Sequence, residues 1–412
     1  MSDKRINTLA ILPAIIPSTQ ILIIKPLLTL HQQKKICLTI RFEDQVKISD
    51  FNDQDVVVFS RNFSPICIDW LNYLLEHKIP FIYDIDDNFF DIPQDYSVFA
   101  NTVRQPQYQA VITRFIHQAS LVRVYSLEMI KRLNDFSVNA SFVTGPIDWK
   151  NILNTKKKKS RKINILYATS RINDDKLSTI FENALVEIIK KYDEKINVYF
   201  WGFHPELNIT RKNIQLLNYE MNYDRYLRKL SSSSFDIGLA PLKDDVFHRS
   251  KSNIKFREYA ASGIVGVYSN VNVYANDVGD NQNGILVENT TESWFNGISM
   301  LIENNSLRTK IKNNAFEYAK THFSQTSFEE QWLKDIQQVA EAKFPSFDFP
   351  PSIGMDAIAA KPKNQADSPN PIRKYLSILL RNKPKTIISM VKMRLSRKYQ
   401  LFVLQFKLKK DN

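Results

Sequence analysis

Hydroxyl, ammonium and carboxylate groups gather around the start of one short predicted helix, in the segment SKSNIKFREYAASG at residues 250–263. Ser252 and Asn253 are good N-terminal caps, so we expect the helix to begin there. The free N–H groups and the dipole of a helix start attract anions, and Lys251 and Lys255 add positive charge at the same end. These residue types in this order predict a phosphate site.

A single carboxylate, Glu258, lies about one turn and a half further along the same helix. A carboxylate beside a phosphate site is repulsive unless it accepts hydrogen bonds from hydroxyl groups, such as those of a ribose. Gly263 would end the helix, because the next buried strand requires a residue with positive φ there. The alternative is a surface helix with an ordinary glycine cap, and the local chemistry leaves both interpretations open.

An acidic cluster formed by Asp84, Asp86 and Asp87 lies in the segment PFIYDIDDNFFDIP, residues 80–93. The cluster follows a predicted strand, which places it at the edge of a parallel sheet where ligands bind. We expect these carboxylates to bind acceptor hydroxyl groups rather than a metal ion. A purely structural helix cap is a further alternative.

The elements that must position these residues are short apolar strands that alternate with amphipathic helices along the chain. This alternation is typical of parallel sheets that are covered by helices on both faces. A lysine-rich segment at residues 148–162 interrupts the pattern, which then restarts. The sequence therefore predicts an α/β protein with two lobes, at residues 1–150 and 151–343, joined by a hinge.

Glycine is scarce, and none of the glycines precedes Gly145. A dinucleotide fingerprint needs glycines after the first strand, for the tight turn and for the close approach of a pyrophosphate. The first lobe is therefore not expected to bind NAD or FAD. The phosphate-loop signature of NTPases is also absent from the sequence, and we expect no cofactor and no bound metal.

The net charge of +13 is concentrated at the C-terminus, since residues 371–412 carry 12 lysines and arginines and only one acidic residue. Residues 344–371 are rich in proline and are expected to form a linker. Apolar and basic residues alternate at helical spacing in residues 372–412, which predicts binding to an anionic membrane surface. No nucleic-acid module accompanies the charge, and a disordered solvated tail is the alternative.

The expected location of the protein in the cell depends on two features that we do not find in the sequence, a membrane span and a signal peptide. No apolar run reaches the roughly 18 residues that a membrane span needs. The first residues are mixed and contain prolines, unlike a signal peptide. We therefore expect a cytoplasmic protein that is peripheral on the inner face of the cytoplasmic membrane.

The segments SKSNIKFREYAASGIVGVYSN, NGILVENTTESW and FSQTSFEEQW resemble the donor-binding lobe of the GT-B glycosyltransferases. More narrowly, they resemble the retaining family-4 (group 1) enzymes that build bacterial surface polysaccharides, as does PFIYDIDDNFFDIP in the first lobe. The resemblance implies two Rossmann-like doubly wound lobes that face a cleft. It also implies a nucleotide-sugar donor in the C-terminal lobe and a saccharide or lipid-linked saccharide acceptor in the N-terminal lobe.

Family members usually carry two glutamates separated by seven residues. The second, which typically holds the donor ribose, matches Glu258, whereas the first, which typically contacts the donor sugar, falls on Ser250. The family also places an arginine and a lysine after the first strand of the donor lobe to hold the diphosphate. Arg171 and Lys176, with four residues between them, match that arrangement. The donor-binding residues that follow from the motif and its loop are His248, Ser250, Lys251, Ser252, Asn253, Lys255 and Glu258.

Sugar transfer from a nucleotide donor builds negative charge on the departing diphosphate, and fixed cations aimed at that charge lower the barrier. The resemblance thus implies catalytic roles for Arg171, Lys176 and Glu258 in a hexosyltransferase. Two alternatives remain open. One is a nucleotide-sugar epimerase or hydrolase on the same fold, and the other is a catalytically idle binding protein that uses its basic tail for membrane or RNA.

Overall fold

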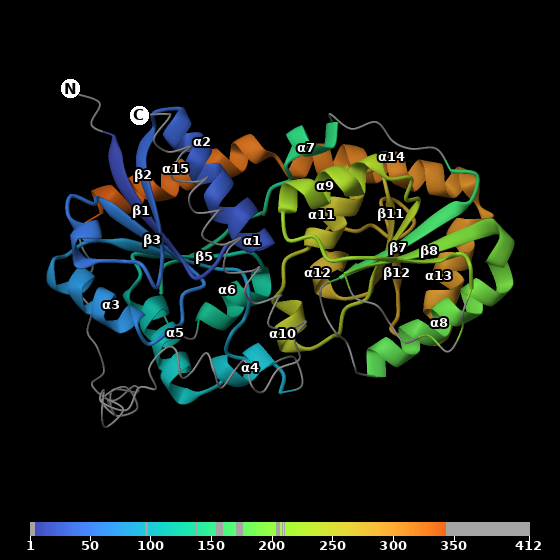
Figure 1. Cartoon of the computed structure of the whole chain (residues 1–412), viewed down its shortest axis with the longest axis horizontal. Helices are drawn as coiled ribbons and strands as arrows, with labels where there is room; N and C mark the ends of the chain where they lie inside the picture. The colour runs from blue at the N-terminus through green and yellow to red at the C-terminus, as the bar shows by residue number, and fades with distance from the viewer. Residues whose placement is uncertain are drawn as a thin grey trace, which may run out of the picture.

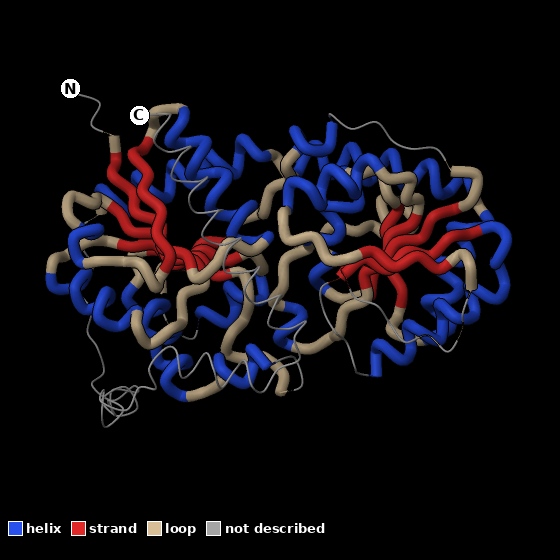
Figure 2. Tube along the Cα trace, in the orientation of Figure 1, coloured by secondary structure: helices blue, strands red, loops and turns tan. Residues whose placement is uncertain are grey.

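The computed structural model describes residues 5–342 apart from 95–97, 135, 137, 154–159, 170–175, 203–206, 208 and 210. Two α/β lobes lie side by side, each built on a six-stranded parallel sheet (Figure 1). Figure 2 shows that the strands of each lobe form its centre and that helices surround them. The predicted pair of α/β lobes with parallel sheets is therefore confirmed. The predicted linker, 344–371, and the basic tail, 372–412, lie outside the described residues.

The N-terminal sheet has the strand order β2-β1-β3-β4-β5-β6. Its strands are β1 (Ile6–Leu12), β2 (Ile36–Phe42), β3 (Val56–Ser60), β4 (Phe81–Ile85), β5 (Leu121–Val124) and β6 (Ala140–Phe142). Strands β3 and β4 are buried at every position, as their continuous apolar runs require in a sheet covered on both faces. The strand order reverses between β1 and β3, which is where doubly wound sheets bind ligands.

The C-terminal sheet has the order β12-β11-β10-β7-β8-β9, which is the Rossmann order read from its other edge. Its strands are β7 (Ile163–Thr169), β8 (Ile196–Gly202), β9 (Ile214–Leu217), β10 (Ile237–Ala240), β11 (Val265–Ser269) and β12 (Ile285–Val287). Here the order reverses between β7 and β10. The connection from β10 to β11 contains the segment 250–263, so the fold brings this segment to the switch point.

The helices cover both faces of each sheet (Figure 1). Those before β7 are α1 (Pro17–Thr19), the π-helix η1 (Gln20–Ile24), α2 (Lys25–Gln32), η2 (Ile48–Phe51), α3 (Cys67–Glu76), α4 (Val98–Val103), α5 (Pro106–Gln118), α6 (Leu127–Asn134) and α7 (Trp149–Leu153). Those after it are α8 (Lys176–Tyr192), η3 (Asp193–Lys195), α9 (Tyr223–Ser232), α10 (Val246–Arg249), α11 (Ile254–Ala261), α12 (Asn272–Ala275), α13 (Thr291–Glu303), α14 (Asn305–His322) and α15 (Gln325–Glu341).

Helix α15 is the last described element, yet it packs against α2, β1, β3 and β4 of the N-terminal lobe (Figure 1). Trp332 of α15 is fully buried, and its indole N–H donates a 2.8 Å hydrogen bond to the carbonyl of Leu22. Arg123 of β5 stacks on the same indole, 3.7 Å from its centroid, and pairs with Asp335. The interval 151–343, which the sequence places in the C-terminal lobe, therefore includes a helix that packs on the N-terminal sheet.

Candidate functional site

A cavity of about 450 Å³ lies between the two lobes, within the size range of small-molecule sites. Its C-terminal wall is formed by the ends of β7, β8 and β10 with α9 and α11, and its N-terminal wall by α1 and the residues after β4. The polar and aromatic residues that line it are Ser18, Asp86, Asp87, Tyr167, Thr169, Trp201, Tyr219, Glu220, Tyr223, Tyr226, Lys251, Ser252, Lys255, Arg257, Glu258 and Tyr274.

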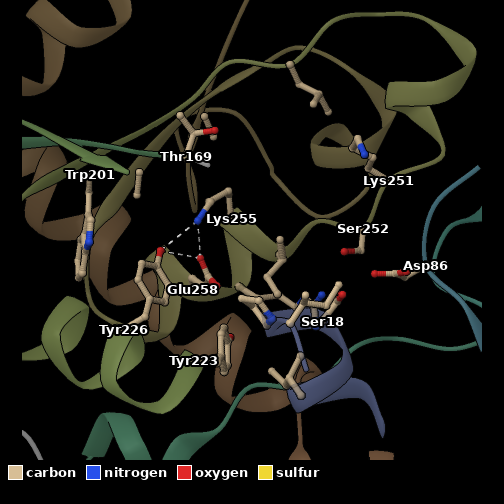
Figure 3. A pocket seen from close by; sticks show the side chains of 18 of the residues that line it. Ser18, Asp86, Thr169, Trp201, Tyr223, Tyr226, Lys251, Ser252, Lys255 and Glu258 are labelled. Atoms are coloured by element: carbon tan, nitrogen blue, oxygen red, sulfur yellow. Dashed lines mark hydrogen bonds and ion pairs between the residues drawn. The ribbon is translucent and has the colours of Figure 1, made fainter. Parts of the chain in front are cut away.

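Glu258 of α11 is the centre of a polar cluster on the C-terminal wall (Figure 3). Its Oε2 accepts a hydrogen bond from Lys255 Nζ at 2.8 Å and another from the hydroxyl of Tyr226 at 3.0 Å. Lys255 Nζ also lies 3.0 Å from the Tyr226 hydroxyl. Burial, followed by the charge of Glu258, raises the pKa of Tyr226 well above its ordinary value, so the phenol keeps its proton. The cluster presents a fixed carboxylate to the cavity, which suits binding of hydroxyl groups.

Helix α11 begins at Ile254, with Asn253 at the N-cap position that the sequence predicts. The Asn253 side chain makes no capping hydrogen bond, and its Nδ2 donates to Asp277 Oδ2 at 2.6 Å. Gly263 follows the helix with φ of 62°, which confirms the predicted left-handed ending. The start of α11, with Lys251 and Lys255 beside it, therefore faces the cavity with positive charge.

One ion pair that crosses between the lobes and two that lie within the N-terminal lobe hold carboxylates on the N-terminal wall. Lys251 Nζ lies 2.7 Å from Asp87 Oδ1. Arg61, directly after β3, donates to Asp86 Oδ2 at 2.8 Å and to Asp87 Oδ2 at 3.1 Å. Burial raises the pKa of Asp86, and the charge of Arg61 opposes that change. Both carboxylates are thus held at the cavity wall by cations.

An aromatic surface forms the remaining part of the C-terminal wall. The rings of Trp201 and Tyr226 lie 4.9 Å apart, and the Trp201 indole N–H donates to the carbonyl of Asn218 at 3.0 Å. Gly202 has φ of 96°, and a Cβ there would lie 2.3 Å from the Thr169 carbonyl oxygen. Only glycine lets the ends of β7 and β8 approach this closely. A planar base can stack on such aromatic faces.

Asp84 does not reach the cavity, although the sequence groups it with Asp86 and Asp87 as an acceptor-binding residue. It lies within β4 and is 1% exposed. Its Oδ2 accepts hydrogen bonds from the Tyr125 hydroxyl at 2.5 Å and from Arg123 Nε at 3.3 Å. The structure therefore corrects this part of the predicted site: Asp84 belongs to a buried network inside the N-terminal lobe.

Three residues of the predicted donor-binding set do not line the cavity: Asn253, whose side chain binds Asp277, and Ser250 and His248. Ser250 is 1% exposed, and its hydroxyl donates to the Val246 carbonyl at 2.7 Å. His248 is buried and pairs with Asp245, with 2.8 Å between Nδ1 and Oδ2. Neither residue lines the cavity, because their side chains hold α10 and its loop in place. Lys251, Ser252, Lys255 and Glu258 of the same motif do line it.

The predicted diphosphate residues follow β7, as expected from the family pattern. Arg171 lies outside the described residues, and Lys176 is described only as the first residue of α8. Their contact with a diphosphate therefore stays a prediction.

Sequence analysis does not single out Arg61, Trp201 and Tyr226. Arg61 directly follows β3, and Trp201 precedes a glycine at the end of β8. Both positions lie at the ligand-binding edge of a parallel sheet, which is a signal that the sequence carries. Tyr226 lies within the amphipathic helix α9 and gives no comparable signal.

The described part of the chain contains no group of three or more His, Cys, Asp or Glu residues that could hold a metal ion. Among the described helices, none is both long enough and apolar enough to cross a membrane.

No protein-family model and no curated protein matches the sequence. Among solved structures, the chain is similar to a sucrose-phosphate synthase from Thermosynechococcus elongatus, with 10% identity and a TM-score of 0.60 over 81% of this chain and 98% of that one. It is similar to Anabaena HepE in complex with UDP and glucose, with 12% identity and a TM-score of 0.60 over 81% and 100%. It is also similar to a glycosyltransferase from Rickettsia africae, with 12% identity and a TM-score of 0.58 over 82% and 99%. At these identities the likeness shows the fold, and the chain therefore has the GT-B fold that its sequence motifs imply.

Proposed function

We propose that this protein is a glycosyltransferase that moves a sugar from a nucleotide-sugar donor to a saccharide or lipid-linked saccharide acceptor. The observation that carries the proposal is the position of the Glu258, Lys255 and Tyr226 cluster. It lines a cavity between two GT-B lobes, at the switch point of the C-terminal sheet. By resemblance to the family-4 enzymes, the reaction retains the configuration of the sugar and serves bacterial cell-surface polysaccharide biosynthesis.

The donor is proposed to bind the C-terminal wall. Glu258 accepts hydrogen bonds from the ribose hydroxyl groups, and Trp201 with Tyr226 supplies an aromatic face for the base. Arg171 and Lys176 hold the diphosphate and stabilise the charge that develops on it as the sugar leaves. Because HepE was solved with UDP and glucose, we propose a UDP-sugar as the first donor to test.

The acceptor is proposed to bind the N-terminal wall, where Asp86 and Asp87 face the cavity. Carboxylates accept hydrogen bonds from sugar hydroxyl groups. The proposal also places the enzyme at the inner face of the cytoplasmic membrane, with the basic residues 372–412 on anionic lipid. Sequence alone supports this last part.

The test is a melting-temperature screen of the full chain against UDP-, GDP-, ADP- and CMP-sugars. A donor at about 100 times its Kd stabilises the folded protein by roughly 2.7 kcal/mol, which a melting curve resolves. Glu258→Gln should weaken binding of that donor at least about tenfold, because hydrogen bonds to a charged acceptor contribute roughly 1.5–3 kcal/mol each. Glu288→Gln, at an exposed carboxylate, is the matched control and should bind as the wild type does.

The outcome separates the proposal from its alternatives. A protein that no nucleotide sugar stabilises is a binding protein of another kind, and the proposal fails. Release of nucleotide that does not depend on an acceptor indicates a hydrolase, and a donor returned with an altered sugar indicates an epimerase.

A further inference from the structure

A short segment of the C-terminal lobe is anchored in the N-terminal lobe. Phe247 of α10 is 2% exposed and packs in the hydrophobic core of the N-terminal lobe. The backbone carbonyl of Ser250 accepts a 2.8 Å hydrogen bond from the Ser126 hydroxyl, and the Ser250 hydroxyl accepts one from Asn88 Nδ2 at 3.2 Å. Lys251 is the next residue, so contacts with the opposite lobe fix its backbone.

The side chains of Lys251 and Asp87 both line the cavity and pair with each other there. The Lys251 ammonium lies 4.1 Å from the centroid of the Phe247 ring and 2.7 Å from Asp87 Oδ1. Asp87 presents its other oxygen to Arg61, which also binds Asp86 and Ser18. Arg61 therefore holds the carboxylate in place, and Lys251 is the cation of this group that lines the cavity.

An anion in the cavity and the carboxylate of Asp87 need the same ammonium group. A lysine is a point charge that binds carboxylate and phosphate oxygens alike. If the proposed donor binds here, its diphosphate and Asp87 are alternative partners for Lys251. The negative charge of Asp87 would then oppose diphosphate binding through this one lysine.

We propose that Asp87 competes with the donor diphosphate for Lys251, and that this carboxylate of the N-terminal lobe limits how tightly the protein holds a nucleoside diphosphate. The inference rests on the proposed function, because the anion is the diphosphate of the donor or of the product. It makes Asp87 a residue that favours release of the nucleoside diphosphate after sugar transfer. A nucleoside without phosphate does not compete with Asp87, because it carries no negative charge for Lys251 to bind.

Calorimetric titration of the full-length protein with UDP and with uridine tests the inference. Asp87→Asn should tighten UDP binding about fivefold, the scale of one partly buried ion pair, and should leave uridine binding unchanged. Lys251→Met, which keeps the length of the side chain, should weaken UDP binding and again leave uridine binding unchanged.

The double variant distinguishes competition from repulsion at a distance. In the Lys251→Met background, Asp87→Asn should no longer tighten UDP binding, since there is no ammonium left to compete for. An equal effect of Asp87→Asn in both backgrounds would mean that its charge simply repels UDP, and would overturn the inference. Asp50→Asn removes another arginine-bound carboxylate of the N-terminal lobe and is the matched control, with no change expected.

Failure of the inference and failure of the proposed function give different results. If the wild-type protein binds none of UDP, GDP and ADP, the proposed function fails and the inference with it. Suppose instead that the wild type binds UDP, and that the Asp87→Asn variant has an unchanged melting temperature but does not bind UDP more tightly. In that case the inference alone fails.

Discussion

At the scale of single residues, the buried carboxyl group of Asp84 has unusual titration behaviour. Burial raises its pKa to about 7, while the charge of Arg123 and the Tyr125 hydrogen bond act in the opposite direction. In the unfolded chain the same group titrates near its ordinary value of about 3.9. Between these two values the folded protein keeps a proton that the unfolded chain has released, so this group makes stability fall as the pH rises.

We expect the stability difference between the wild type and Asp84→Asn to depend on pH. The carboxyl of Asp84 binds its proton more tightly in the folded protein than in the unfolded chain, whereas the amide of the variant does not titrate. The wild type should therefore lose stability relative to the variant as the pH rises from about 4 to about 7. Urea unfolding of both proteins at pH 5 and pH 8 measures the difference. A difference that is equal at the two pH values would show that the pKa of Asp84 does not change on folding.

The sequence identifies candidate residues well where the signal is local. The helix start near Lys255 and the ending at Gly263 depend on neighbouring residues only, and both are found as predicted. Asp84 could have been separated from Asp86, because the apolar run of β4 continues through Ile85 and buries what lies before its end. The pairing of Lys251 with Asp87 could not be predicted, since 164 residues separate them and only the packing of the two lobes brings them together.

At the scale of elements, one contact of α15 with the N-terminal lobe lies close to a proline of the helical run that it packs against. Pro26 has no N–H, so within the continuous run of α1, η1 and α2 it cannot bind the carbonyl of Leu22, four residues earlier. The buried indole of Trp332 donates to that carbonyl instead, at 2.8 Å. The carbonyl that Pro26 cannot bind is thus the point at which α15 makes a hydrogen bond to this helical run.

We expect Trp332→Phe to destabilise the protein by roughly 1–3 kcal/mol, because the carbonyl of Leu22 loses its donor inside the core. In the Pro26→Ala background the cost should be smaller by about 1 kcal/mol, since an alanine N–H can satisfy the same carbonyl. Urea unfolding of the four proteins measures both costs. Trp294→Phe is the matched control: Trp294 is also fully buried, and its indole N–H has no hydrogen-bond partner among the described residues.

The control substitution Trp294→Phe should lower the free energy of unfolding by the same amount with and without Pro26. An equal cost of Trp332→Phe in both backgrounds would contradict the proposed link between the proline and the indole. The alternating pattern of the sequence predicts amphipathic helices between the strands. It does not predict their contact, because a missing N–H in one helix says nothing about which donor replaces it.

At the scale of the whole molecule, the two lobes are joined by more than the hinge that the sequence predicts. The chain connection itself is fixed at Gly145, where a Cβ would lie 2.2 Å from Arg257 Nη1, and the same guanidinium donates to the Pro146 carbonyl at 2.9 Å. Helix α15 and α10 add contacts on the N-terminal lobe. Hydrophobic periodicity predicts that each segment is buried but does not specify which lobe buries it.

We expect deletion of residues 371–412 to leave the body folded, with the same midpoint of urea unfolding, because the described cores are completed by α15 at Glu341. The full chain should sediment with vesicles that contain anionic lipid, since each lysine or arginine near such a surface contributes on the order of 1 kcal/mol. The deletion should abolish that binding. Added salt should weaken it without removing it, because the Debye length falls to about 3 Å at 1 M while apolar contacts are not screened.

Vesicles of neutral lipid are the control and should bind neither protein. A full chain that does not bind anionic vesicles at low salt would refute the membrane interpretation. A deletion that unfolds the body would show instead that the tail packs on the lobes.

The packing of α15 and Phe247 on the N-terminal lobe also determines how this protein can be recombined with others of its fold. A chimaera in which residues 1–150 are replaced by the corresponding part of another protein would keep α15. The Trp332 indole and Asp335 of that helix contact Leu22 and Arg123 in this protein, and both partners would be lost. The chimaera would also place Phe247 against a foreign core. The exchangeable unit is therefore discontinuous in sequence: a functional graft of the N-terminal lobe has to bring α10 and α15 with it.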